Sequence, residues 1–355
     1  MILANRKNRS IPLRGSESGT ICAGKSRPSQ LARIGPPKPA CFRINGVVRV
    51  KGLGDSNSNQ VIIGKDGWLY QSGLTTNEHA PLIEDIGPEE AAVWRDYFRT
   101  NRDTLAHLGI RYLVVIGPDK STVYPEHMPE SGRNLISDVS TNRIIDGLKR
   151  DGVADVDPRA ILRANKGEGL YYHTGVHWND RGAFLAYSQV ANQLRKDFPR
   201  LTPLSASDMN YSVHVVGGAG LAGMLGIRDA VHEAAPLICE RHPSWYFDGS
   251  PCLLHDDTIQ FRDLVVTRST RQEIPKCMIF RDSFSTGLLP YLSEHISQAI
   301  YKWPYQLDYT AIEQQHPNIV IGSMDFSVGT SRAFPRRTRW RYGSFQTFES
   351  HAPRL

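Results

Sequence analysis

Two short segments of the chain carry side chains suited to acyl chemistry. In "IFRDSFS" (279–285), Ser283 follows an apolar run and stands at the predicted start of a helix. Backbone N–H groups at such a junction can stabilise an oxyanion while the serine hydroxyl attacks an acyl carbon. In "HTGVHWND" (173–180), His177 is a candidate acceptor for the hydroxyl proton. Together the two segments favour a serine nucleophile activated by a histidine base.

The usual third member of such a site is missing from the histidine segment. A histidine base is normally held in one tautomer by a carboxylate, but Gly175 stands two residues before His177. Asp180 and Asp282 are alternative acids, although Asp180 suits a helix N-cap and Asp282 suits bracing the turn before Ser283. A backbone carbonyl holding the ring is a further alternative. Each segment alone also fits a structural role, as an N-cap or a packed histidine.

The elements around these segments alternate between strands and helices. Apolar runs and turn residues predict a hairpin over 61–70 and strands at 110–117, 152–157, 277–280, 299–303 and 318–323. Helical spacing predicts helices over 88–108, 137–150, 158–165, 180–198, 309–316 and 285–295, the last interrupted by Pro290. This alternation favours an α/β fold with a mostly parallel sheet flanked by helices. The two candidate residues would then meet at the carboxyl edge of that sheet.

Charge and composition divide the chain into three parts. The net charge of +6 comes from the ends, because residues 1–50 hold ten Lys/Arg against one acid and residues 331–355 hold six against one. We expect a basic disordered arm (1–50), a domain over 51–330 with an irregular insertion at about 199–270, and a basic disordered tail (331–355). Because the middle part is acidic, no nucleic-acid partner is expected. No apolar run is long enough to span a membrane, and "MILANRKNRS" shows no signal peptide.

The cysteines and acidic residues form no metal-binding pattern. Cys239 and Cys252 flank a short segment and could close a loop disulfide, while Cys277 before "MIF" suits a core thiol. The pairing of the five cysteines stays open. We expect neither a metal nor a cofactor.

Four segments in order resemble one known family, the alginate O-acetyltransferase AlgX/AlgJ family of the SGNH hydrolase-like group. They are "GKDGWLY" (64–70), "GPDKSTVYPEHMP" (117–129), "YYHTGVHWNDRGA" (171–183) and "FRDSFSTGLLPYLSEH" (280–295), and the similarity spans about residues 60–320. The resemblance implies a periplasmic enzyme that moves acetyl groups onto an exported bacterial polysaccharide through an acetyl-serine. The family nucleophile falls on Ser283 and the family base on His177.

The chain departs from the family pattern at one position of the site, and it offers further residues that could bind substrate. The family pattern Asp-x-His-Trp reads Gly175-Val176-His177-Trp178 here, so the triad acid is absent. Candidate substrate-binding residues are Trp178, Lys120, Tyr124 and Arg281. The implied partners are a polysaccharide acceptor and a membrane acetyl-donor protein. Two alternatives to acetyl transfer stay open, an acetyl-ester hydrolase and a non-catalytic carbohydrate-binding protein.

Overall fold

The computed structural model describes residues 58, 60–72, 86–130, 138–240, 242–247, 262–303 and 306–325. The chain divides into two compact units, Met1–Pro37 and Lys38–Leu355, and every described residue lies in the second. The predicted basic arm (1–50) and basic tail (331–355) therefore lie outside the described residues, as does the partner cysteine Cys252.

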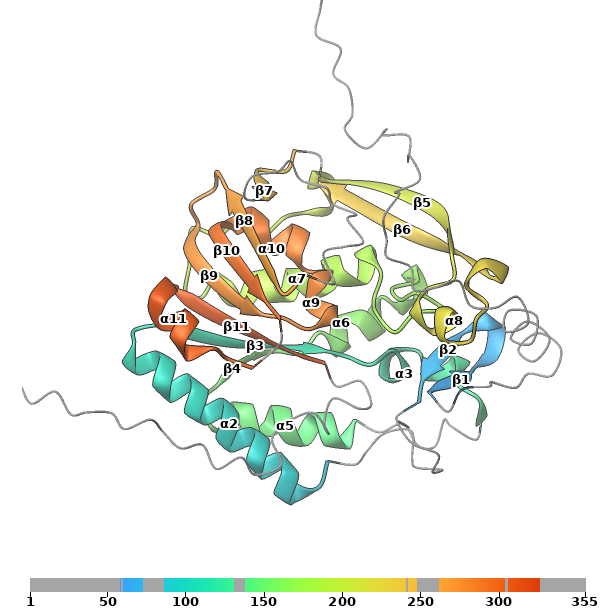
Figure 1. The fold of residues 1–355 in the computed structure, drawn as a ribbon, viewed down its shortest axis with the longest axis horizontal. Coiled ribbons are helices and arrows are strands. Elements are labelled where there is room, and N and C mark those ends of the chain that lie inside the picture. Colours follow the sequence, from blue (N-terminus) through green and yellow to red (C-terminus); the bar gives the residue numbers. More distant parts are fainter. Residues whose placement is uncertain are drawn as a thin grey trace, which may run out of the picture. The chain divides into compact units, whose positions relative to one another are not determined.

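A seven-stranded sheet forms the centre of the described part (Figure 1). In spatial order its strands are β4 (Ala154–Val156), β3 (Arg111–Gly117), β11 (Ile319–Asp325), β9 (Ile274–Phe280), β10 (Ile296–Lys302), β8 (Leu264–Ser269) and β7 (Trp245–Phe247). The first five run parallel to their neighbours, whereas β8 and β7 pair antiparallel at one edge. The mostly parallel sheet expected from the sequence is confirmed.

The central strands are apolar throughout because both faces of the sheet are covered. Along β3, Leu113 and Val115 contribute to one buried cluster, while Val114 and Ile116 contribute to the cluster on the opposite face. The free thiol of Cys277 on β9 is fully buried, which confirms its expected place in the core. Burial also raises the pKa of this thiol, so it stays protonated and unreactive.

Helices cover both faces of this sheet. One face carries α2 (Pro88–His107), α5 (Val139–Arg150) and α11 (Tyr309–Gln315), and the other carries α6 (Arg159–Ala164), α7 (Asp180–Leu194) and α10 (Leu289–His295). In Figure 1, α2 and α5 run side by side. Two four-residue helices, α3 (Lys120–Val123) and α9 (Ser283–Thr286), follow directly after β3 and β9. Short 3-10 turns occupy Lys65–Gly67, Pro125–His127, Lys166–Glu168, Ala206–Asp208 and Arg228–Ala230.

Pro290 starts a helix instead of interrupting one. The sequence predicts a single helix over 285–295, but α9 ends at Thr286 and α10 begins at Leu289, with Pro290 in its first turn. Proline is favoured there because the first N–H groups of a helix have no intrahelical partner to lose.

Residues 199–270 contain more regular structure than the predicted irregular insertion. They hold a long antiparallel hairpin, β5 (Met209–Gly217) with β6 (His232–Glu240), the short helix α8 (Gly220–Met224) between them, and the edge strands β7 and β8. The residues of β5 from Met209 to Val215 alternate between apolar and polar, as in a half-buried strand, yet most of β5 is exposed, including Tyr211, Val213 and Val215.

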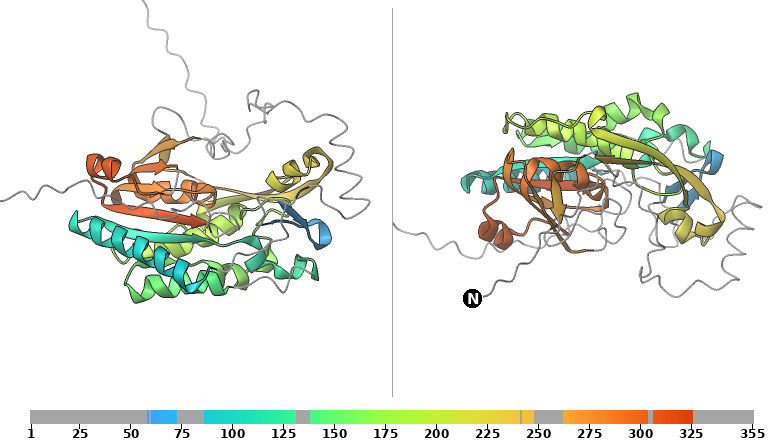
Figure 2. Two further views of the ribbon diagram at one scale, coloured as in Figure 1. Left: turned by 60° about the horizontal axis from the view of Figure 1, so that its bottom comes forward. Right: turned by 90° about the horizontal axis from the view of Figure 1, so that it is seen from above.

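The β5–β6 hairpin reaches the small hairpin at the start of the described chain. β1 (Val61–Ile63) pairs antiparallel with β2 (Leu69–Gln71), as the sequence predicts, and Asp66 and Gly67 take positive φ in the turn. Val61 and Leu69 pack against Leu221 near α8. In Figures 1 and 2 the two hairpins, yellow and blue, accordingly lie side by side.

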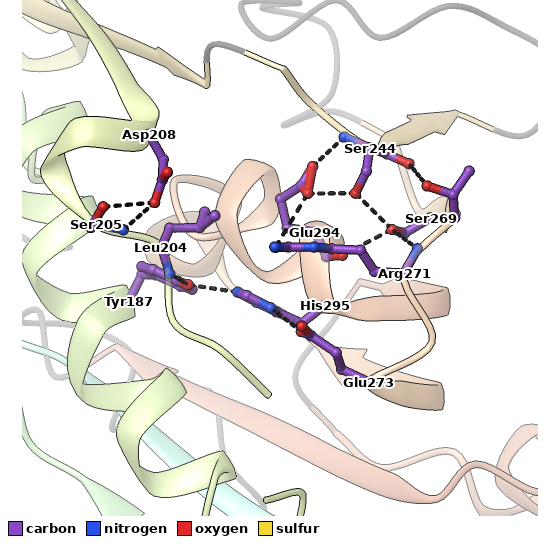
Figure 3. Close-up of polar contacts among 11 residues, drawn as sticks. Tyr187, Leu204, Ser205, Asp208, Ser244, Ser269, Arg271, Glu273, Glu294 and His295 are labelled. Carbon is purple, nitrogen blue, oxygen red and sulfur yellow. Dashed lines mark hydrogen bonds and ion pairs between the residues drawn. The ribbon is translucent and has the colours of Figure 1, made fainter. Parts of the chain in front are cut away.

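A buried polar network joins α7 and α10 to the antiparallel edge of the sheet (Figure 3). The Tyr187 hydroxyl accepts from the Leu204 N–H (2.8 Å) and donates to His295 Nε2 (2.6 Å). The other ring nitrogen of His295 then donates to Glu273 (2.5 Å). Because the Tyr187 hydroxyl and both ring nitrogens of His295 have partners, the network fixes how α10 sits beside α7.

The end of β3 tolerates only a glycine. A Cβ on Gly117 would lie 2.8 Å from Cγ of Phe284, the residue after Ser283. We expect Gly117→Ala to lower the free energy of unfolding by about 1–3 kcal/mol, because the ring must move in a packed core. Chemical denaturation measures this. Gly167→Ala is the matched control, since nothing lies within 4 Å of the added Cβ, and equal losses in both variants would contradict the packing argument.

Candidate active site

Ser283 lies at the carboxyl edge of β9, in a turn that Asp282 braces. The Asp282 carboxylate accepts from the backbone N–H of Ser285 (2.9 Å) and from the hydroxyl of Ser323 on β11 (2.8 Å). The Ser285 hydroxyl in turn accepts from the Asp282 N–H (3.1 Å), which completes a capping box. These bonds confirm the expected bracing role of Asp282 and fix where Ser283 begins α9.

His177 lies in the loop that precedes α7. The loop folds back on itself through a bridge between Tyr171 and Trp178 and a hydrogen bond from the Tyr172 N–H to the His177 carbonyl (3.3 Å). The N-cap of α7 is Asn179, whose side chain accepts from two N–H groups of the first turn, so the cap expected at Asp180 is one residue earlier. Asp180 instead accepts from the Ile238 N–H of β6.

The two candidate residues meet although they are 106 positions apart. His177 Nε2 lies 2.7 Å from Ser283 Oγ. The ring of Phe284 packs edge-on against both His177 (4.8 Å between centroids) and Trp178 (5.0 Å), and the Trp178 indole N–H donates to the Phe284 carbonyl (3.2 Å). The geometry therefore suits proton transfer from the serine hydroxyl to the imidazole.

The electrostatic surroundings keep the His177 ring neutral. Burial, and next the positive charge of Lys120, lower the pKa of His177 from 6.5 to about 4. A neutral ring can accept the serine proton, but the imidazolium that results is disfavoured by the same surroundings. Within the described ranges, the structure gives no hydrogen bond from this ring to a carboxylate.

None of the three proposed substitutes for the triad acid contacts the ring. Asp180 and Asp282 use their carboxylates in the helix and turn contacts described above, and burial raises the pKa of Asp282. Gly175 contributes a backbone carbonyl, but this oxygen accepts from Lys120 Nζ (2.6 Å). A Cβ at position 175 would lie 3.0 Å from Cβ of Ala219 and 3.1 Å from Cβ of Tyr172, so the site is closed around a glycine.

The four candidate substrate-binding residues are buried in the structure. Trp178 and Tyr124 are each 4 % exposed, Lys120 is 2 % exposed and Arg281 is fully buried. The Tyr124 hydroxyl donates to the Lys166 carbonyl (2.7 Å) and accepts from the Leu170 N–H (2.8 Å). These side chains hold backbone in place and leave little surface for a sugar.

Arg281 and Lys120 are buried cationic side chains that donate hydrogen bonds to groups inside the protein. The Arg281 guanidinium donates to the Thr286 hydroxyl (2.8 Å) and to the Arg262 carbonyl, and it lies over the Trp303 ring. Burial lowers the pKa of Arg281. Lys120 Nζ donates to three loop carbonyls, and burial lowers its pKa from 10.5 to about 7.

Sequence reasoning missed a second anchor of the histidine loop, Glu233 on β6. Its carboxylate accepts from the His173 N–H (2.5 Å) and from the Thr174 hydroxyl, while the Thr174 oxygen also accepts from the Ala219 N–H (2.8 Å). Glu233 is 60 residues from His173 and belongs to no recognisable motif, so no local signal could have identified it. Across the described ranges, no group of three His, Cys, Asp or Glu side chains could hold a metal ion.

Part of the chain is similar to one protein family. Residues 61–228 match the model of the "SGNH hydrolase-like domain, acetyltransferase AlgX". The probable alginate O-acetylases AlgJ of Pseudomonas syringae pv. tomato and Pseudomonas aeruginosa are each 26 % identical, over 39 % and 38 % of this chain and 34 % and 33 % of their own length. The matched part is thus about a third of these curated relatives.

Solved structures agree on the fold. PatB1 of Bacillus cereus, solved with a sulfonyl adduct, superposes with a TM-score of 0.58 at 13 % identity, covering 78 % of this chain and 97 % of PatB1. The O-acetyltransferase domain of Pseudomonas putida AlgJ superposes with a TM-score of 0.50 at 16 % identity, covering 78 % and 95 %. At these identities the likeness establishes a shared SGNH-like fold.

The lowered pKa of His177 predicts its protonation state directly. Because the folded-state pKa lies below the ordinary 6.5, the ring should stay neutral as pH falls through 6.5 and should gain its proton only near pH 4. An NMR titration of the ring carbons, with the signal assigned by its loss in His177→Gln, measures the midpoint. A midpoint close to 6.5 would contradict the buried, acid-free environment.

Proposed function

We propose that the chain is a member of the AlgX/AlgJ family of SGNH hydrolase-like proteins, which residues 61–228 resemble, and that it transfers acetyl groups through an acetyl-serine intermediate on Ser283. The observation that carries this proposal is the 2.7 Å contact between His177 Nε2 and Ser283 Oγ. A protein that only binds carbohydrate has no need of this contact, so its retention supports catalysis over the binding-only alternative.

The first half-reaction acylates the serine. Ser283 Oγ attacks the acetyl carbonyl while its proton passes to His177 Nε2. The bond between the acetyl carbon and the donor oxygen breaks, and the leaving oxygen takes the proton back from His177. In the second half-reaction an acceptor hydroxyl gives its proton to His177 and attacks the acetyl-serine, which restores the free serine.

The absent acid has a kinetic consequence. The imidazolium formed in each half-reaction lacks a carboxylate, and in serine proteases the loss of that partner lowers turnover by roughly 10⁴ while leaving residual catalysis. We therefore expect acylation at a slow rate. Glycine at position 175 makes this chain a weak catalyst compared with a complete triad.

The acceptor and the place of action follow from the relatives. Two relatives are named as probable alginate O-acetylases, which supports a polysaccharide acceptor. A membrane acetyl-donor partner and a periplasmic location are further parts of this proposal. Among the described residues, no helix has both the length and the apolar character to cross a membrane.

Acylation of Ser283 can be tested with a simple acetyl ester such as 4-nitrophenyl acetate. We expect intact-mass spectrometry to detect an acetyl adduct on the unmodified protein and none on Ser283→Ala, because only this hydroxyl is paired with the base. Ser207→Ala, at an exposed position, is the matched control and should label normally. An unmodified protein that never labels would rule out the acyl-enzyme.

The same adduct separates transfer from hydrolysis. If the protein is a transferase, an added polysaccharide acceptor should speed loss of the adduct and gain the acetyl group itself. Loss to water alone, at a rate that the acceptor does not change, would favour the acetyl-ester hydrolase.

Restoring the missing carboxylate should raise the rate. Because a Cβ at position 175 meets Ala219, the test is the double variant Gly175→Asp with Ala219→Gly, which removes the closest contact. We expect faster ester turnover by at least about tenfold, a small part of the roughly 10⁴ at stake. Ala219→Gly alone is the control. A double variant that folds but turns over no faster than this control would mean that the ring needs no carboxylate.

A further inference from the structure

Lys120 is a buried cation with an unusual set of partners. The residue opens α3, directly after the β3 strand, and its side chain is almost fully enclosed. Its Nζ donates to the carbonyl oxygens of Tyr172 (2.9 Å), His173 (2.9 Å) and Gly175 (2.6 Å). An ammonium group has three donors, so these carbonyls use its full capacity.

The three carbonyls belong to the loop that carries His177. These carbonyls lie two, four and five residues before His177, and Lys120 is the donor that satisfies them. Buried carbonyls left without a donor are costly, so the loop conformation that presents His177 to Ser283 depends on the ammonium group. The opposite side of the loop is held by Glu233.

The charges around Lys120 make its buried ammonium tolerable. Asp119 precedes it, Glu233 approaches from β6, and both favour the charged form. The rings of Trp68 and Tyr70 lie 5.3 and 5.0 Å from Nζ, where a cation is attracted to the ring faces. The only charged group that acts on the His177 ring among the causes of its shift is Lys120.

We propose that Lys120 is the positioning residue of this site, which holds His177 in line with Ser283 by tying the carbonyls of residues 172, 173 and 175 to one ammonium group. This inference rests on the proposed acyl-transfer function of Ser283 and His177. Lys120 thereby supplies the orientation that a triad carboxylate would otherwise give, but not its charge. The loop, rather than the ring, is what is held.

Lys120 affects His177 in two ways that can be measured separately. It holds the loop in the reactive conformation, which favours catalysis, and its charge lowers the pKa of the ring, which disfavours the protonated base. Removing the ammonium group should loosen the loop and slow the chemistry, yet it should also make His177 easier to protonate. A residue that merely stabilised the fold would have no reason to change the ring's pKa. Measuring both effects in one variant therefore distinguishes positioning beside the ring from general stability.

The test uses Lys120→Met, with Lys149→Met on the exposed side of α5 as the matched control. Phenylmethylsulfonyl fluoride reports on the reactivity of Ser283. Ser283 Oγ forms a bond to the sulfur of the reagent, the S–F bond breaks and fluoride leaves. His177 takes the proton of the serine hydroxyl. Mass spectrometry gives the labelling rate, NMR gives the pKa of the His177 ring, and amide hydrogen exchange reports on residues 171–178.

In Lys120→Met we expect labelling to slow by about 10²-fold, the order of loss for a misplacement near 1 Å. The ring's pKa should rise above that of the unmodified protein, and the loop amides should exchange faster. Lys149→Met should match the unmodified protein in all three measurements. A folded Lys120→Met that labels within twofold of the unmodified protein, with an unchanged titration, overturns the proposal.

Two further variants keep the test decisive. If Lys120→Met does not fold, Lys120→Gln retains two of the three N–H donors without the charge. An unchanged labelling rate together with an unchanged pKa of the His177 ring in this variant would overturn the proposal. Glu233→Gln loosens the other side of the loop but should leave the ring's pKa unchanged, because Glu233 is not among the causes of its shift. If the pKa of the His177 ring shifts as much in Glu233→Gln as in Lys120→Met, any loosening of the loop changes this pKa. That result would contradict a specific effect of Lys120.

The proposed function and the positioning role fail in different ways. If the unmodified protein is never sulfonylated, the acyl-enzyme proposal fails, whereas the exchange and titration results still decide whether Lys120 holds the loop. If the unmodified protein is sulfonylated and Lys120→Met behaves the same, only the positioning role fails.

Discussion

One hydrogen bond, between His177 Nε2 and Ser283 Oγ, constrains the arrangement of the described chain. Its two ends come from different structural sources. The serine is fixed by the carboxyl edge of β9 and by the capping box around Asp282, whereas the histidine is carried by a loop with no regular structure of its own. The bond therefore lasts only while the sheet edge and the loop keep their mutual distance, and the loop anchors matter as much as the sheet.

The charge around this bond is the reverse of that in a complete triad. A triad places an anion behind the imidazole, but here the one charged group among the causes of the ring's lowered pKa is Lys120, a buried cation. Burial first, and Lys120 second, lower the pKa of His177 and make its protonated form costly. The arrangement keeps His177 ready to accept a proton but does not stabilise the imidazolium that forms. This agrees with the proposal of a site that has the geometry for catalysis but reacts slowly.

Local patterns in the sequence were sufficient to predict most of the fold. Apolar runs of strand length, helical spacing and turn residues such as Gly67 identify elements from their own residues, and the parallel sheet follows from their alternation. They failed where an element depends on its neighbours. Pro290 marks a helix start only because the chain turns before it. The apolar–polar alternation of β5 does not correspond to a buried face, since Tyr211, Val213 and Val215 are exposed.

For the site, the sequence by itself determined which residue types could do chemistry: Ser283 after a strand, His177 before a helix and a glycine where an acid would stand. Only the tertiary structure decided what surrounds them. Lys120 and Trp178 are buried and bond to backbone carbonyls, and Glu233 comes from a strand without a recognisable motif. The physical reason is that the role of a buried polar side chain depends on the group to which it hydrogen-bonds. These partners lie about 50 to 110 positions away in the chain.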